Sequence, residues 1–146
     1  MGIANPGLGP TIAETMKTLG RSRALVVHGA GTDEIAVHGN TLVWELKDGE
    51  ISHYTVAPAE LGVDKHMLED LRGGDGEENA AAMRATFAGE GPAAHRDAVA
   101  ANAGAMVYLY GMADSLAEGT AHAKQLLADG SVAQWLRTHE EADYSG

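Results

Sequence analysis

Residues 24–35, ALVVHGAGTDEI, combine a short apolar run with a glycine-containing loop and two adjacent acids. The continuous apolar run at residues 24–27 is typical of a strand that is covered on both faces, as in a parallel sheet. A His-Gly pair ends the run, and the loop follows it. In open α/β sheets, ligands bind in the crevice beyond the carboxyl ends of the strands. We therefore predict a buried strand that leads into a loop where a binding site would lie.

A helix is expected before this strand. Asn5 and Pro6 form a favourable helix start, with Asn5 as the cap and Pro6 in the first turn. Pro10 would remove an early helical hydrogen bond, so the regular helix is expected to begin there, and Gly20 ends it. With residues 1–4 as a short strand, the order strand, helix, strand predicts a right-handed crossover between parallel strands.

Residues 41–56, TLVWELKDGEISHYTV, predict an antiparallel hairpin. Asp48 and Gly49 are a strong signal for a two-residue turn, which places Leu46 opposite Ile51. The two faces of the hairpin then carry, respectively, Leu42, Trp44, Leu46 and Ile51, and Val43, Tyr54 and Val56. Because both faces are partly apolar, the hairpin is expected to pack into a larger body.

The remainder of the sequence has a helical pattern. A capping box at residues 75–78 opens one helix, and residues 93–110 form a second. The later part of this second helix, AANAGAMVYLY, is apolar nearly all round, so the helix is expected to be central and buried. Ser115 and Ser131 are predicted caps of two further helices. Residues 140–146 are expected to fray. The fold class that follows is α/β, with a mostly parallel sheet, the hairpin at about 41–56 and C-terminal helices in one domain of residues 1–146.

Composition narrows the classes of partner. Ten Lys and Arg residues against 21 Asp and Glu residues give a net charge of −11. Phosphate backbones and anionic membranes attract clustered basic residues, so this charge argues against nucleic acid and against a membrane surface. The absence of cysteine excludes a disulfide and a thiol nucleophile and fits a cytoplasmic protein. No stretch approaches the length of a membrane span.

Asp33 and Glu34 are the candidate metal ligands. Two adjacent carboxylates on a loop suit magnesium, which takes oxygen ligands and is usually held by one or two carboxylates together with substrate phosphates. The alternative interpretation places both acids in the first turn of a helix, where they would complement the helix dipole. The spacing alone is compatible with either role.

Three other features each have a functional and a structural interpretation. The glycines of residues 72–75 could let the backbone approach a phosphate, but Glu77 and its neighbour would repel an anion, which favours a turn and helix cap. His28 either borders the site or is a hydrogen-bonded structural residue. Met106 and Tyr110, at helical spacing, are predicted core positions rather than part of a cofactor site. No residue pattern of a catalytic nucleophile is present.

Four segments occur in a characteristic order: RALVVHGAGTDEI, ELKDGEI, LEDLRGGDGEENA and RDAVAANAGAMVYLYGMADSLAEG. Together they resemble the C-terminal portion of the anthranilate phosphoribosyltransferase family, over about residues 2–136. The resemblance implies a small helical domain and a larger α/β domain in complete family members. It also implies transfer of the phosphoribosyl group from phosphoribosyl pyrophosphate to anthranilate, in tryptophan biosynthesis, with Mg²⁺ as cofactor.

The resemblance assigns roles only where residues match. The family's Asp-Glu pair after the V-H-G strand binds the magnesium that contacts pyrophosphate, and Asp33 and Glu34 match that pair. The family's G-T-G-G-D phosphate loop, its K-H-G-N segment and most of its helical domain have no counterpart here. No catalytic or other cofactor-binding residue is therefore assigned.

Two functional hypotheses follow from the resemblance. In the first, residues 1–146 are the C-terminal portion of the α/β domain of an enzyme and are inactive alone. Phosphoribosyl pyrophosphate and anthranilate then bind only with the N-terminal half, which is either part of a longer chain or supplied by a partner chain. The isolated portion is expected to self-associate or to have limited stability. In the second, the chain is a non-catalytic binding or assembly protein that retains the fold.

Overall fold

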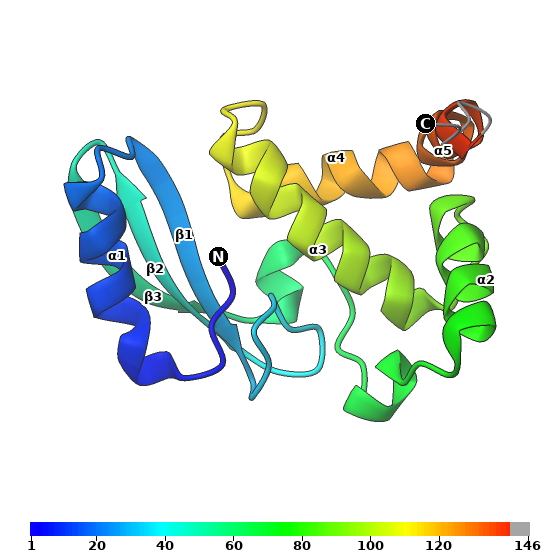
Figure 1. Ribbon diagram of the computed structural model, residues 1–146, viewed down its shortest axis with the longest axis horizontal. Helices are drawn as coiled ribbons and strands as arrows, with labels where there is room; N and C mark the ends of the chain where they lie inside the picture. Colours follow the sequence, from blue (N-terminus) through cyan, green and yellow to red (C-terminus); the bar gives the residue numbers. More distant parts are fainter. Residues whose placement is uncertain (141–146) are drawn as a thin grey trace, which may run out of the picture.

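A three-stranded sheet and the helices on its two sides form the body of the computed structural model, which describes residues 1–140 (Figure 1). The main elements in chain order are α1 (Gly9–Thr18), β1 (Arg23–Gly29), β2 (Thr41–Lys47), β3 (Glu50–Val56), α2 (Gly76–Phe87), α3 (Ala93–Leu109), α4 (Leu116–Ala128) and α5 (Ser131–Glu140). Three short 3₁₀ helices accompany them: η1 (Pro6–Leu8), η2 (Pro58–Leu61) and η3 (Leu68–Leu71). The chain is thus mixed α and β, as expected.

The sheet has the order β1-β2-β3, and both neighbouring pairs are antiparallel. The prediction of a mostly parallel sheet is therefore wrong. In the described residues a parallel contact remains at Gly2 and Val27, where the amide of Ile3 donates to the carbonyl of Val27 at 2.9 Å. The first residues do run beside β1 in the expected direction, but they form an isolated bridge and not a strand of the sheet.

Helices cover both faces of the sheet, which explains the apolar run of β1. On one face Val26 and Trp44 pack with Ala13 of α1. On the other face Val27 and Val43 belong to a larger cluster that includes side chains of α3. Figure 1 shows the same arrangement, with α1 on the outer side of the sheet and α3 toward the other helices. A strand buried on both faces needs apolar residues throughout, whichever way its neighbour runs.

The hairpin prediction is confirmed. β2 and β3 pair with Leu46 opposite Ile51, and the turn residues Asp48 and Gly49 have φ angles of 52° and 83°. Both residues lie in the left-handed region that the commonest two-residue hairpin turn requires. Val43 is fully buried, which agrees with the expectation that the hairpin packs into a larger body.

The helix starts were mostly predicted correctly. The side chain of Asn5 caps η1, and α1 begins at Gly9, one residue before the predicted position. Asp75 and Ser115 cap α2 and α4 through side-chain oxygens that accept backbone N–H groups. Ser131 is not a cap, because it is the first residue of α5 and its own amide donates to the side chain of Asp129. The expectation that residues 140–146 fray falls almost wholly outside the described residues.

α3 is buried on one side only, so the prediction of burial all round is wrong. Met106 and Tyr110 are 51% and 77% exposed, and their assignment to the core is wrong too. The aromatic residue of α3 that is buried is Tyr108. α3 crosses α4 at two glycines, Gly104 and Gly119. A Cβ on Gly104 would lie 2.4 Å from the amide nitrogen of Thr120, so the two helix backbones are in close contact. Within residues 1–140, no helix has the length and apolar character needed to cross a bilayer.

Candidate metal centre

A tight turn connects the end of β1 to the candidate metal ligands. The backbone groups of Gly29 and Thr32 bond each other in both directions, at 3.0 and 2.8 Å. Ala30 and Gly31 between them have positive φ angles of 47° and 95°. The hydroxyl of Thr32 also donates to the carbonyl of Gly29 at 2.7 Å. The turn reverses the chain, so that the next residues lie beside the end of the strand.

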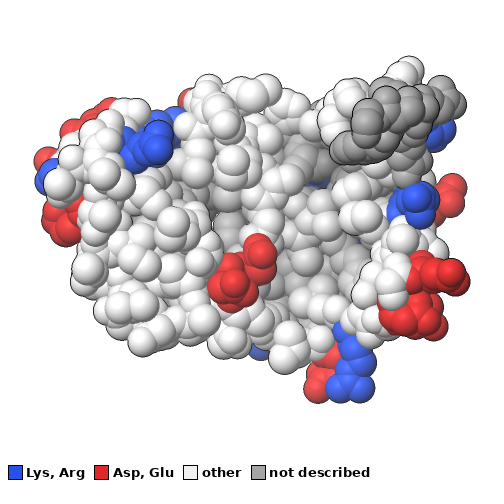
Figure 2. All heavy atoms as spheres, viewed as in Figure 1, with Lys and Arg blue, Asp and Glu red and all other residues white. Residues whose placement is uncertain are grey.

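Asp33 and Glu34 follow this turn, and both are exposed. They lie between β1 and β2, and the next regular element is a strand and not a helix. The alternative that they occupy the first turn of a helix is therefore wrong. Figure 2, drawn from the same side as Figure 1, shows acidic side chains near the middle of the view, where the β1–β2 loop lies in Figure 1.

The backbone of the loop is held although its two acids are exposed. A Cβ on Gly29 would lie 2.3 Å from the carbonyl oxygen of Glu34, so only glycine permits this approach. Asn102 of α3 accepts from the amide of Ile35 at 2.9 Å and donates to its carbonyl at 3.0 Å. The hydroxyl of Thr41, which is fully buried, accepts from the amide of Ala36 at 2.9 Å. The two carboxylates therefore project from a fixed backbone.

The donor set fits magnesium better than a metal that needs a complete protein cage. Asp33 and Glu34 offer carboxylate oxygens, the ligand type that magnesium prefers. Among residues 1–140, no three His, Asp or Glu side chains are grouped closely enough to hold a metal ion by themselves. A magnesium ion here would have to take its remaining ligands from water and from a substrate, which is its usual mode of binding.

Two other sequence candidates have structural roles. Nδ1 of His28 lies 2.9 Å from the carbonyl oxygen of Ile3, so His28 fixes the first residues of the chain. In the glycine-rich turn before α2, the amide of Gly74 donates to Asn79 and that of Asp75 donates to Glu78. These amides are already bonded within the loop, which supports the predicted helix cap over a phosphate site.

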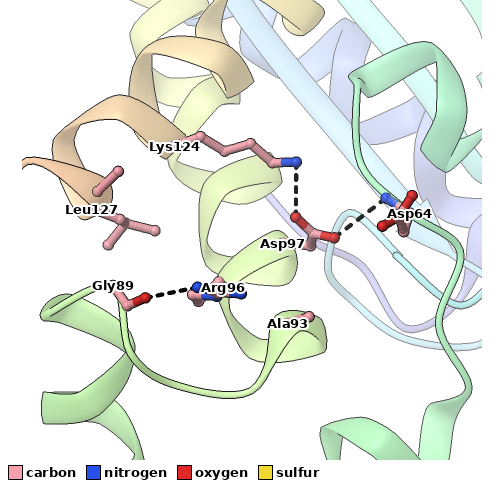
Figure 3. A pocket seen from close by; sticks show the side chains of 8 residues that line it. Asp64, Gly89, Ala93, Arg96, Asp97, Lys124 and Leu127 are labelled. Carbon is pink, nitrogen blue, oxygen red and sulfur yellow. Dashed lines mark hydrogen bonds and ion pairs between the residues drawn. The ribbon is translucent and has the colours of Figure 1, made fainter.

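A second group of charged residues lines a hollow of roughly 320 Å³ between α3, α4 and the segment after η2 (Figure 3). Asp97 is one of the residues that line it and is 7% exposed. One carboxylate oxygen lies 2.9 Å from Nζ of Lys124, and the other lies 2.8 Å from Nε2 of His66. The amide of Asp64 also donates to Asp97, at 3.3 Å. Asp97 therefore ties three segments of the chain together.

The hydrogen bonds keep Asp97 ionised. Burial alone would raise the pKa of its carboxyl, but the hydrogen bonds from His66 and Lys124 outweigh burial and hold the pKa below its ordinary value. Lys124 has a second acceptor in the carbonyl of Gly62, at 2.8 Å. Because these charges satisfy one another, the group is suited to holding the fold and not to binding an ion.

A buried carboxylate also lies between the sheet and α3. Glu45 of β2 is 8% exposed and accepts hydrogen bonds from the hydroxyl groups of Tyr54 and Tyr108. Burial, followed by the hydrogen bond to Glu45, raises the pKa of the Tyr54 hydroxyl well above its ordinary value. The guanidinium carbon of Arg23 lies 4.5 Å from the centre of the Tyr108 ring. This group joins α3 to the sheet.

Asn102 and Asp97 were not among the candidate residues predicted from the sequence. Asn102 interrupts an apolar stretch of α3, and a polar side chain within an apolar stretch is a signal that it has a buried partner. Asp97 follows two other polar residues, at positions 95 and 96, so it gives no such signal. Their partners at Ile35 and Asp64 are 67 and 33 residues away along the chain. A pairing over such a separation leaves no local pattern in a single sequence.

Known proteins similar to this chain agree on one family. Residues 1–133 match the family described as "Glycosyl transferase family, a/b domain". An anthranilate phosphoribosyltransferase of Corynebacterium efficiens is 67% identical over 147 residues, covering 100% of this chain and 43% of the relative. One of Shewanella loihica is 45% identical and covers 100% of this chain and 43% of its own length. The chain thus spans about 40% of the length of these relatives.

Solved structures show the same fold. Anthranilate phosphoribosyltransferase of Thermus thermophilus matches with a TM-score of 0.84 and 41% identity, over 94% of this chain and 40% of that one. The Saccharomyces cerevisiae enzyme, solved in complex with PRPP and Mg, matches with a TM-score of 0.78 over 93% of this chain and 40% of its own. Its identity is 21%, so it supports the fold alone.

Proposed function

The chain belongs to the anthranilate phosphoribosyltransferase family, and from this premise we propose that it supplies the magnesium-binding carboxylates of a phosphoribosyl transfer to anthranilate. Its residues would form the C-terminal portion of the α/β domain of such an enzyme. The substrates would be phosphoribosyl pyrophosphate and anthranilate, bound together with segments that relatives have outside the matched portion. The proposed metal ligands are Asp33 and Glu34.

The observation that carries the proposal is the exposed Asp33-Glu34 pair on a backbone that is fixed on both sides. Gly29 and the Thr32 turn hold the loop before the pair, and Asn102 holds it after the pair. Two adjacent exposed carboxylates repel each other, so a purely structural role would not favour them at this place. A cation that both carboxylates bind would remove that repulsion.

The negative charge of the loop gives a reason for a metal between it and a pyrophosphate substrate. The chain carries a net charge of −11, and the loop presents two carboxylates. A pyrophosphate group would be repelled from such a surface unless a divalent cation lay between the phosphate and carboxylate oxygens. Asp33 and Glu34 could therefore interact with the leaving group of the donor substrate only through the ion that they bind.

The mechanism requires positioning and charge neutralisation and no protein nucleophile. The amine of anthranilate attacks the anomeric carbon as the bond to pyrophosphate breaks, so negative charge develops on the leaving group. Magnesium, when bound, supplies a Lewis acid and a template for that group. Asp33 and Glu34 would hold the ion, and the hydrogen bonds on both sides of the pair would keep their backbone in place.

A chimera tests the proposal. These 146 residues would replace the matching part of the C. efficiens relative, which is 67% identical. The chimera is expected to consume anthranilate in the presence of phosphoribosyl pyrophosphate and magnesium, measured as loss of anthranilate fluorescence. The natural relative is the positive control. A folded chimera without turnover would contradict the proposal and would favour a non-catalytic binding or assembly role for this chain.

A further inference from the structure

We propose that Asn102 is a positioning residue that sets the backbone of the Asp33-Glu34 loop for metal binding. The inference rests on the proposed magnesium role of these two acids and names the residue on which their geometry depends. Asn102 lies on α3, which is far from the loop in sequence, and its side chain forms the contact between them.

The amide side chain of Asn102 makes three hydrogen bonds. Oδ1 accepts from the amide of Ile35 at 2.9 Å, and Nδ2 donates to the carbonyl of Ile35 at 3.0 Å. The second hydrogen of Nδ2 is directed to the carbonyl of Ala98, one turn back on α3, at 3.0 Å. The first two bonds imitate the pairing of a neighbouring strand, and the third holds the side chain in the orientation that makes them possible.

Because Ile35 directly follows Glu34, its hydrogen bonds with Asn102 affect the backbone of the proposed metal ligands. Asn102 bonds the amide nitrogen of Ile35, and this nitrogen forms a planar peptide unit with the carbonyl of Glu34. The hydrogen bond from the Ile35 amide therefore also restrains the backbone of Glu34. On the other side, the Gly29–Thr32 turn fixes the residue before Asp33. The two acids are therefore the exposed middle of a segment held at both ends. Without Asn102, the end that follows Glu34 would still be held by Ile35 packing, by the Ala36 bond to Thr41 and by the hydrogen bond from the amide of His66 to the carbonyl of Val37, but the two bonds next to Glu34 would be lost.

The chain contains a matched control for this contact. Asn79 of α2 accepts from the amide of Gly74 at 2.9 Å and donates to its carbonyl at 3.0 Å. It therefore makes the same two-bond contact with a different loop. Replacing Asn79 removes the same kind of hydrogen bonds and leaves the metal loop untouched, so comparison of the two variants separates positioning from general stability.

The test is a titration of the ¹⁵N-labelled 146-residue chain with Mn²⁺, a paramagnetic substitute for Mg²⁺, followed by the broadening of amide NMR signals. In the unmodified chain, broadening is expected to centre on residues 33–35. Asn102→Ser is the first variant, because its hydroxyl can bond the carbonyl of Ala98 but is too short to bridge to Ile35. Asn102→Ala is the second variant, and Asn79→Ser is the control.

The expected result for both Asn102 variants is that the same broadening at residues 33–35 needs about tenfold more Mn²⁺, since loss of a supporting residue typically weakens metal sites by 10- to 100-fold. Asn79→Ser should match the unmodified chain at those residues, even if its melting temperature falls as much. Faster hydrogen exchange of the Ile35 amide in Asn102→Ser, and not in Asn79→Ser, would accompany the loss.

Two results would overturn the inference, and they differ in what they say of the metal site. If the unmodified chain and Asn102→Ser show the same local broadening at the same Mn²⁺ concentration, Asn102 has no positioning role and the metal site stands. If the unmodified chain shows no broadening centred on residues 33–35, the proposed metal role fails and the role of Asn102 fails with it.

Discussion

Asp97 is the residue on which most of the polar contacts among α3, α4 and the segment after η2 converge. Its carboxylate is buried, and it is stabilised in the ionised form by His66 and Lys124. Removing a hydrogen bond to a charged group typically costs about 1.5–3 kcal/mol. Protonation of Asp97 should therefore loosen the contact between these segments.

The pKa of Asp97 in the folded chain is lower than its ordinary value of 3.8, so folding favours the carboxylate. Its contribution to the free energy of unfolding is present above that ordinary value and is lost as the pH falls through the lower folded-state pKa. In Asp97→Asn, the melting temperature at neutral pH is expected to fall, and its decline between about pH 5 and pH 2 should be shallower. Calorimetry at a series of pH values would measure both effects.

Asp129→Asn is the matched control for this experiment. The pKa of Asp129 is also lowered, by its hydrogen bonds with Ser131, but this carboxyl is fully exposed. Solvent screens exposed groups, so this variant should change the pH dependence less. Equal pH profiles for Asp97→Asn and the unmodified chain would show that the buried carboxylate contributes nothing that depends on its charge.

Among single residues, the sequence identified those whose role depends on their neighbours along the chain. The spacing of Asp33 and Glu34 was compatible with a loop or with the first turn of a helix, and the structure places both acids on a loop. Asn102 and Asp97 were missed because their partners come from distant segments. Met106 and Tyr110 were misplaced because a 3.6-residue period identifies a helix face but not which apolar face the fold covers.

Among the elements, α3 and α4 depend on close contact between their backbones. A Cβ on Gly119 would lie 2.2 Å from the carbonyl oxygen of Gly104, and one on Gly104 would meet the backbone of Thr120. The contact also brings Lys124 to Asp97. A side chain at either glycine would push the helices apart.

Gly104→Ala is therefore expected to lower the free energy of unfolding by about 1–3 kcal/mol, the usual cost of overpacking, or more if the helices cannot shift. Urea unfolding followed by circular dichroism would measure it. Gly76→Ala is the control, because a Cβ at this first residue of α2 would meet no atom within 4 Å. It should leave stability unchanged or raise it slightly. Similar values for the two variants would contradict the close packing of α3 on α4.

Elements with local signals were easier to predict than the direction of the sheet. The Asp48-Gly49 turn fixed the register of the hairpin, and the caps at Asp75 and Ser115 fixed two helix starts. The apolar run of β1 correctly indicated burial on both faces. The run could not show whether the neighbouring strand is parallel or antiparallel, because α1 and α3 can cover an antiparallel sheet equally well.

At the scale of the whole molecule, the 146 residues span about 40% of the length of their relatives. In the proposed reaction, the metal ligands would be one part of a site that also binds a ribose phosphate and an aromatic amine. No family motif for those two ligands was found in this sequence. We therefore expect the 146-residue chain alone to show no turnover with anthranilate, phosphoribosyl pyrophosphate and magnesium, measured by anthranilate fluorescence. Turnover well above a blank without protein would show that these residues contain a complete site.

The most direct test of the account is the magnesium dependence of turnover in the chimera with Asp33→Asn and Glu34→Gln. These changes keep the size of both side chains and remove their charge. Glu77→Gln with Glu78→Gln is the control, since it neutralises another adjacent pair of exposed acids, at the start of α2. We expect the first variant to need at least about tenfold more magnesium for half-maximal turnover, while the control follows the unmodified chimera. A magnesium curve for Asp33→Asn with Glu34→Gln that matches the unmodified chimera would contradict it.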